Sequence, residues 1–228
     1  MRVEERIEYE QALAFTTRFP AMTRTSRQPP LAPRKAPTQR RAAATVEAIL
    51  EAAARILETQ GLEGYTTNAV AERAGVSIGS LYQYFPHRDA LTAALIEQET
   101  AALVAQAREA ARGETCAAVL RGLIDAAVAH QMRRPALARV IDFEERRLPM
   151  GERNERVAGM LQRIMVEALQ LHDAPAVADR EQAAQDVLAL AHGMIDAAGE
   201  RGETDAPGLR LRVEVAVRGY LVGMACAG

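Results

Sequence analysis

The sequence predicts an all-α protein of about nine helices, in which an N-terminal three-helix helix-turn-helix domain precedes a C-terminal helical bundle. From residue 40 onward, apolar residues recur every three or four positions, and the strict alternation typical of strands is absent. A glycine near residue 75 separates two short helical patterns, as in a helix-turn-helix. No run reaches the roughly 18 apolar residues of a membrane span, and no secretion signal is present, so we expect a cytoplasmic protein.

Three segments are expected: a disordered N-terminal extension over 1–37, the helix-turn-helix domain over 38–86, and a ligand-binding and dimerisation domain over 87–228. The extension contains a basic arm that begins at Met22, which has six Lys or Arg up to Arg41, four prolines and no acidic residue. This arm is interpreted as a contact to phosphate groups or, alternatively, as a solvated linker. Met22 is also an alternative start, which would make residues 1–21 an upstream extension. The net charge of −2 does not exclude nucleic acid, because binding depends on where the charges lie.

The first helix is predicted from Arg40 to Gln60 and should end at Gly61, because glycine favours the left-handed conformation that follows a helix. Two short helices follow near 67–74 and 78–85, and a long fourth helix runs from about 88 to 112. The later apolar patterns predict helices over 116–128, within 135–148, over 157–169, and near 178–199 and 207–225.

The last two predicted helices are apolar on two sides. Because each apolar side must be covered, one is expected to pack within the chain and the other against a second copy of it. The flanking set includes Leu190, Leu211, Val215 and Val222. We assign a homodimer interface to the following residues of these helices: Val187, Ala191, Met194, Val213, Val217, Tyr220 and Leu221. The alternative is that both helices are buried within a monomer.

The segment Thr66–Leu91, TTNAVAERAGVSIGSLYQYFPHRDAL, has the spacing of a helix-turn-helix. Ala71 lets two helices approach, Gly75 permits the turn, and Leu81 fixes the second helix on the first. Ser77 is a suitable N-cap for that second helix, so its first turn is free to enter a major groove.

The candidate DNA contacts are the side chains of this segment that packing does not need, together with the basic residues beside it. They are Arg40, Arg41, Thr66, Thr67, Ser77, Ile78, Gly79, Ser80, Tyr82, Gln83, Tyr84 and Arg88. Gln83 is suited to adenine and Ile78 to a thymine methyl group, whereas the hydroxyl groups are suited to phosphate. The alternative is a helical corner with exposed tyrosines. The partner expected for these candidate contacts is double-stranded operator DNA.

This segment resembles the DNA-binding region of the TetR family of transcription regulators. The similarity rests on Thr67, Val70 and Ala71, on the turn AGVS at 74–77, and on the later residues Gly79, Leu81, Tyr82, Phe85 and Leu91. Two positions differ: Tyr84 stands where the family usually has histidine, and Arg88 where it usually has lysine. The resemblance implies a homodimer held by a four-helix interface, a ligand cavity among the fourth to seventh helices, and a fourth helix that shifts when ligand binds.

Polar residues at the ends of apolar stripes are the candidates for an effector site. They are His130, Gln131, Glu144 and His172, with Glu145 and His192 as further possibilities. Cys116 and Cys226 lie in no metal-binding motif, and no catalytic motif is found, so we expect no metal, cofactor or enzyme activity. The predicted function is a repressor that leaves a palindromic operator when an unknown small molecule binds. A dimeric protein-binding module with a vestigial DNA-binding head is the alternative.

Overall fold

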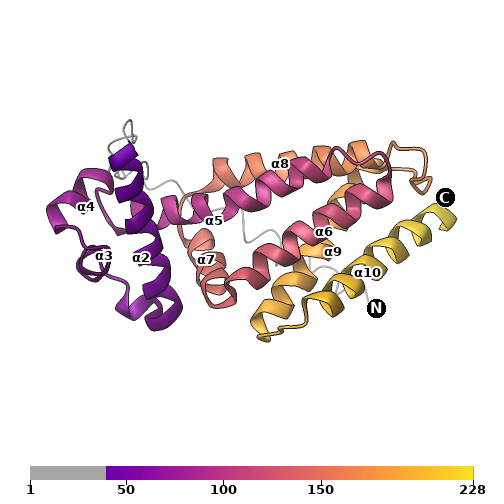
Figure 1. The fold of residues 1–228 in the computed structure, drawn as a ribbon. Helices are drawn as coiled ribbons and strands as arrows, with labels where there is room; N and C mark the ends of the chain where they lie inside the picture. Colours follow the sequence, from indigo (N-terminus) through magenta and orange to yellow (C-terminus); the bar gives the residue numbers. More distant parts are fainter. Residues whose placement is uncertain (1–39, 228) are drawn as a thin grey trace, which may run out of the picture. The chain divides into compact units, whose positions relative to one another are not determined.

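The computed structural model describes residues 40–227, which form the helices shown in Figure 1. In chain order they are α2 (Arg40–Gly64), α3 (Thr67–Arg73), α4 (Ile78–Tyr84), α5 (Arg88–Ala110), α6 (Cys116–Arg133), α7 (Pro135–Arg147), α8 (Gly151–Ala168), α9 (Arg180–Glu200) and α10 (Ala206–Ala227). The described part contains nine helices and no strand, which confirms the predicted fold class. The predicted extension over 1–37, with its basic arm and the alternative start at Met22, lies outside the described residues.

The first helix is interrupted at Gly61, the residue at which the sequence predicts its end, although α2 as a whole extends to Gly64. Gly61 has a φ of 63° and interrupts the helical conformation of α2 before its last residues. Such a positive φ is readily adopted only by a residue without a Cβ. Tyr65 follows the end of α2. Its ring is buried, and its hydroxyl forms a hydrogen bond with that of Thr92 at 3.1 Å.

Helices α2, α3 and α4 form a group at the left of Figure 1 and share one apolar core. Its completely buried members include Ile49 of α2, Val70 of α3 and Leu81 of α4. Later helices also belong to this core, since α5 contributes Leu91, Leu95 and Ile96 and the α7 region contributes Leu137, Ile141, Leu148 and Met150. The orientation of α3 and α4 therefore depends on α5 and α7 as well as on α2.

A second apolar core lies among α6, α8, α9 and α10 and the end of α5. Its members follow the stripes seen in the sequence, such as Val119, Ile124 and Val128 on α6 and Ile164 and Met165 on α8. Asp173 secures the start of α6, because its carboxylate accepts hydrogen bonds from the backbone N–H groups of Cys116 and Ala117 at 2.6 and 3.1 Å.

No helix within residues 40–227 combines the length and apolar character needed to cross a membrane.

Candidate functional site

The turn between α3 and α4 has the geometry that the sequence predicts. Gly75 adopts a φ of 69°, and nothing lies within 4 Å of the position where a Cβ would stand. Glycine is therefore required here by backbone conformation and not by lack of space. The next residue, Val76, donates its backbone N–H to the carbonyl of Ala71 at 3.0 Å, which closes the turn.

Two hydroxyl side chains cap the short helices. Thr66 Oγ1 accepts a hydrogen bond from the backbone N–H of Ala69 at 3.1 Å, and Ser77 Oγ accepts one from Ser80 at 3.0 Å. Each cap satisfies a backbone donor that has no partner inside the helix. Thr66 is exposed, so its hydroxyl can still donate its own proton to an oxygen outside the protein. Ser77 Oγ also lies 2.8 Å from Ser80 Oγ, so one of these two hydroxyls donates to the other and the second is free to donate outward.

Helix α4 is anchored by one side chain and presents the others outward. Leu81 is fully buried, whereas Ile78 and Tyr82 are 37% and 41% exposed. Gly79 and Gln83 are also exposed, while Ser80 and Tyr84 are half-buried. The helix contains no acidic residue, so its outer face can approach phosphate groups without charge repulsion.

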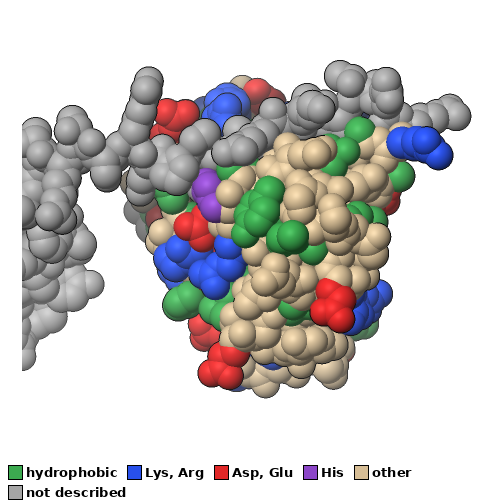
Figure 2. All heavy atoms as spheres, turned by 90° about the vertical axis from the view of Figure 1, so that its left-hand side faces the viewer, with side chains coloured by type: hydrophobic (Ala, Val, Ile, Leu, Met, Phe, Trp, Pro, Cys, Tyr) green, Lys and Arg blue, Asp and Glu red, His purple; other side chains and the backbone are tan. Residues whose placement is uncertain are grey.

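Figure 2 looks at this end of the structure and shows mainly backbone and uncharged side chains in the middle, with charged side chains around them. Tyr82 is held in place by a hydrogen bond of 3.1 Å between its hydroxyl and that of Thr67. This bond joins α4 to the first residue of α3, so the two hydroxyls form one exposed polar group. The predicted contacts of both helices thus lie together.

Basic residues from neighbouring helices complete the predicted set. Arg88 is exposed in the first turn of α5, and its Cζ lies 5.9 Å from the centre of the Tyr65 ring. This cation–π contact keeps the guanidinium near the start of α5. Arg41 is exposed in the first turn of α2, while the side chain of Arg40 lies outside the described residues.

A cavity of about 570 Å³ lies among α5, α6, α7, α8 and α9. Its size is within the range of about 300–1,000 Å³ that is typical of small-molecule sites. Most of the wall is apolar and includes Leu120, Ile124, Leu161, Met165, Leu188 and Ile195. The cavity is therefore suited to a ligand with a substantial apolar body.

Two of the four predicted effector contacts line this cavity, and two do not. His130 and Gln131 line it, as do the further possibilities Glu145 and His192. Glu144 is not among the lining residues, and its buried carboxylate pairs with Arg147 at 2.6 Å. His172 does not line the cavity either and is exposed in the turn that follows α8.

The polar part of the lining also includes residues that sequence reasoning missed. Asp142 of α7 and Asp196 of α9 both line the cavity, together with Arg153 of α8. Asp142 and Glu145 are three residues apart on α7 and therefore lie on one face of that helix. This spacing was the available signal, but it is equally typical of a solvated surface. Within residues 40–227 no group of three or more His, Cys, Asp or Glu is arranged to hold a metal ion.

Two family models match the chain, and both describe the same family. The model for bacterial regulatory proteins of the tetR family matches residues 49–95, and that for a tetracyclin repressor-like C-terminal domain matches residues 115–221. The chain belongs to the TetR family. It is therefore a transcription regulator with a DNA-binding helix-turn-helix.

Solved structures of several regulators have a similar fold. A transcriptional regulator from Rhodococcus sp. Rha1 is 20% identical with a TM-score of 0.66, over 79% of this chain and 97% of that one. The fatty acid degradation regulator FadR from Bacillus halodurans is 19% identical with a TM-score of 0.68, over 81% and 96%. A TetR transcription regulator from Haloarcula marismortui is 18% identical with a TM-score of 0.67, over 80% and 98%. The comparison with curated proteins gives no match.

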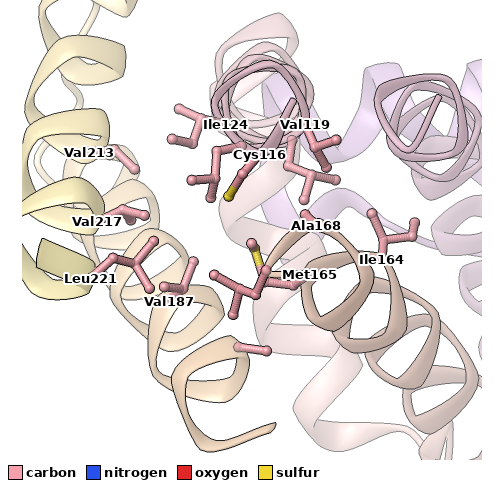
Figure 3. Packing of buried hydrophobic residues seen from close by; sticks show 14 of the residues in the cluster. Cys116, Val119, Ile124, Ile164, Met165, Ala168, Val187, Val213, Val217 and Leu221 are labelled. Carbon is pink, nitrogen blue, oxygen red and sulfur yellow. The ribbon is translucent and has the colours of Figure 1, made fainter. Parts of the chain in front are cut away.

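In this TetR-family chain, four residues assigned to the dimer interface are buried in the subunit itself. Val187, Val213, Val217 and Leu221 are at most 2% exposed, and Figure 3 shows them facing Ile124 and Met165. The chain's own core therefore covers these four side chains without a second copy. Ala191, Met194 and Tyr220 are half-buried at the edge of this core and are still candidates.

The opposite side of the two last helices is exposed and apolar. It includes Leu190 of α9 and Leu211, Val215, Val222 and Met224 of α10. Gly193, Gly219 and Gly223 have nothing within 4 Å of a Cβ position, so the backbone is open to close approach there. The sequence pattern revealed both apolar sets, but periodicity alone does not show which set faces inward.

Helix α7 connects the cavity to helices α2, α3 and α4 of this TetR-family protein, which together are called the DNA-binding head below. Its Ile141 belongs both to the core shared with α2–α4 and to the cavity wall. At the start of α7, Arg134 binds both carboxylate oxygens of Glu58 on α2 at 2.6 and 2.8 Å and reaches Glu51 at 2.9 Å. At its end, Arg147 binds Asp89 at the start of α5 at 2.6 Å. A shift of α7 would therefore act on both α2 and α5.

Proposed function

We propose that this protein is a ligand-responsive repressor that binds a palindromic operator as a homodimer and leaves it when a small molecule enters the cavity. The observation that carries the proposal is the outer face of α4. There the exposed side chains of Ile78, Tyr82 and Gln83 lie beside each other on a helix without acidic residues. We propose 38–86 as the DNA-reading segment and 87–228 as the sensing and dimerising segment.

The side chains of the head divide into base contacts and phosphate contacts. Gln83 can form two hydrogen bonds with adenine, and the side chain of Ile78 can pack against a thymine methyl group. The Thr67–Tyr82 pair, Ser77 and Ser80 can donate hydrogen bonds to phosphate oxygens. The exposed Arg88 and Arg41 add positive charge on either side. Thr66, Gly79, Tyr84 and Arg40 complete the proposed contact set.

Dimerisation is proposed through the exposed side of α9 and α10. A helix-turn-helix protein that reads a palindrome needs two heads in symmetric positions, about 34 Å apart or a multiple of that distance. Leu211 and Val215 are each 62% exposed, which is unusual for neighbouring aliphatic side chains on one helix face. The open glycines of the same face would let the helices of two copies pack closely.

The response to ligand is proposed to pass through α7 and α5. A ligand that favours one position of α7 changes the free energy of the arrangement in which the heads fit DNA. Thermodynamic linkage then requires that DNA weakens ligand binding by the same factor. The ion pairs of Arg134 and Arg147 are the contacts through which α7 would act on the head.

The test is a footprint of the protein on the DNA beside its own gene, repeated with two variants. Tyr82→Ala should weaken binding to all operator sequences about equally, because it removes a phosphate contact. Gln83→Ala should reduce discrimination at one base pair by about 1–3 kcal/mol. Gln170→Ala is a matched control, since Gln170 is exposed beyond the end of α8 and far along the chain from the head.

Protection of an inverted repeat that weakens with salt supports the proposal. Uniform weak binding without a preferred sequence contradicts it and favours the alternative of a protein-binding module. If both variants bind like the parent, the proposed recognition face of α4 is wrong.

A further inference from the structure

The polar side of the cavity is unusually acidic for an effector site with apolar walls. Three carboxylates line it: Asp142 and Glu145 of α7 and Asp196 of α9. Arg153 is the one arginine among the lining residues, and no lysine is found among them in the described part of the chain. The fixed charges on the wall therefore sum to −2, since three negative charges face one positive charge.

The single arginine does not offset the remaining carboxylates, because it is already engaged. Arg153 binds Glu145 at 3.2 Å and Thr100 Oγ1 at 2.6 Å, and it also donates to the carbonyl of Ile96. Its guanidinium donors are thus directed to groups of the protein. A ligand anion that approaches Arg153 would also meet the carboxylate of Glu145 beside it.

Asp142 has no ion-pair partner among residues 40–227. Asp196 lies 3.2 Å from His192, an imidazole that is charged only when protonated. Burial, together with the charges of Asp196 and Glu145, raises the pKa of Asp142 to about 6, although Arg146 and His192 act in the opposite direction. The ionised form of Asp142 is therefore disfavoured until a positive charge comes near it.

Two residues of the cavity wall also have buried polar atoms without a partner. Gln131 is only 4% exposed, and its Nε2, which lies against Gly199 of α9, has no hydrogen-bond partner within the described residues. Nδ1 of the neighbouring His130 is also buried without a partner there. Buried polar atoms are normally satisfied, so such atoms on a cavity wall indicate polar groups that a ligand or water supplies.

We infer that the cavity binds an organic cation with an apolar body, whose positive charge lies beside Asp142 and Asp196 and whose body lies against the apolar wall. This inference rests on the proposed ligand response and specifies the chemical class of the effector. An anionic amphiphile such as a fatty acid would instead place its carboxylate next to unpaired carboxylates, which costs free energy in a partly buried site.

The test uses three ligands with the same ten-carbon chain: decyltrimethylammonium, decanol and decanoate. Their affinities for the full chain are measured by isothermal titration calorimetry below the micelle concentration, because the protein has no tryptophan to report binding by fluorescence. We expect the cation to bind about tenfold or more tightly than decanol, and decanoate to bind most weakly. The same ligands are added to the protein–operator complex to measure release.

Two variants test whether the carboxylate of Asp142 causes the preference for the cation. Asp142→Asn keeps the size of the side chain and should weaken binding of the cation about tenfold, while the affinity for decanol changes less than about twofold. Glu200→Gln is the matched control, because Glu200 is exposed near the end of α9 and does not line the cavity. It should leave all three affinities unchanged.

The outcomes separate the inference from the proposed function. If decanoate or decanol binds as tightly as the cation and releases the operator, the cation inference is overturned but the ligand response stands. If the cation binds preferentially and Asp142→Asn has no effect, the assignment to Asp142 is overturned. If none of the three ligands binds, both the inference and the ligand response are contradicted.

Discussion

Replacement of Arg134 by methionine is expected to destabilise the protein more than any other single loss of charge between α7 and α2. Methionine keeps much of the aliphatic length of arginine but removes the guanidinium. That group forms two hydrogen bonds with Glu58 at 2.6 and 2.8 Å and one with Glu51 at 2.9 Å, and it lies 3.6 Å from Glu99. The side chains of Arg134 and Glu58 are each only 17% exposed.

The magnitude follows from how far each carboxylate is removed from water. The bidentate contact to Glu58 should contribute about 2 kcal/mol, as is usual for charged hydrogen bonds with little exposure. The contact to Glu51, whose side chain is 44% exposed, should contribute less than about 0.5 kcal/mol. Glu99 is nearly buried and would keep only its bond to Arg133. The total is about 2–3 kcal/mol, or roughly 4–12 °C in Tm for a chain of this size.

The pH dependence of stability is a second measure of the contact between Arg134 and Glu58. The hydrogen bonds and charge of Arg134 lower the pKa of Glu58 in the folded protein. A lowered pKa stabilises the fold above the pKa of the unfolded chain, and this contribution is lost as the pH falls through the folded value. The difference in Tm between Arg134→Met and the parent should therefore be full at pH 7 and shrink below about pH 4.

Thermal unfolding followed by circular dichroism measures both effects, and Arg55→Met is the control. Arg55 pairs with the same two carboxylates but is 56% exposed, so its loss should cost less than about 0.5 kcal/mol. Equal destabilisation by the two variants, or a difference for Arg134→Met that does not change with pH, would show that the Arg134–Glu58 contact does not stabilise the fold in this way.

Three further predictions concern single positions. Asp142→Asn should raise the free energy of unfolding by about 1 kcal/mol at pH 8, because a folded pKa of about 6 means that the ionised aspartate destabilises the fold at that pH. The gain should vanish near pH 4, and urea unfolding at both pH values measures it. Gly75→Ala should cost about 1 kcal/mol or more through its positive φ, whereas a neutral result in the same unfolding assay would show that the turn tolerates a Cβ. Leu211→Glu combined with Val215→Glu should give a folded monomer with weakened operator binding, as measured by light scattering and gel shift; an unchanged dimer would place the interface elsewhere.

The sequence was sufficient to predict the helices and the helix-turn-helix. Gly61 and Gly75 adopt the positive φ values expected of them, and Leu81 is fully buried as its spacing requires. These features depend on local conformation and on helical period, both of which a single sequence contains. The exposed positions of α4 follow directly, because they are the positions left after packing is assigned.

The sequence was not sufficient to predict which apolar side of a two-sided helix faces the chain's own core. Val213 and Val217 on one side of α10 and Leu211 and Val215 on the other have similar hydrophobicity and spacing. Only the packing of α6 and α9 against α10 decides that the first pair is buried. Four residues assigned to the dimer interface therefore lie in the chain's own core.

The cavity was only partly predictable for a related reason. Gln131 continues an apolar stripe, a pattern that indicates a polar group near a core, and it lines the cavity. Asp142 and Asp196 could not be found, because carboxylates of α7 and α9 meet only in the folded chain. Glu144 differs from Glu145 by one position on α7, and this rotation turns its side chain from the cavity toward Arg147.

The most direct test of the central claim is selection of DNA sequences by the purified full chain from a random pool, followed by binding measurements at several salt concentrations. We expect enrichment of an inverted repeat whose half-site centres lie about one helical turn apart or a multiple of it, with affinity that falls as salt rises. Tyr82→Ala should bind the selected sequence more weakly. Recovery of no common sequence, or of one that Tyr82→Ala binds as well as the parent does, would contradict the claim that α4 reads DNA.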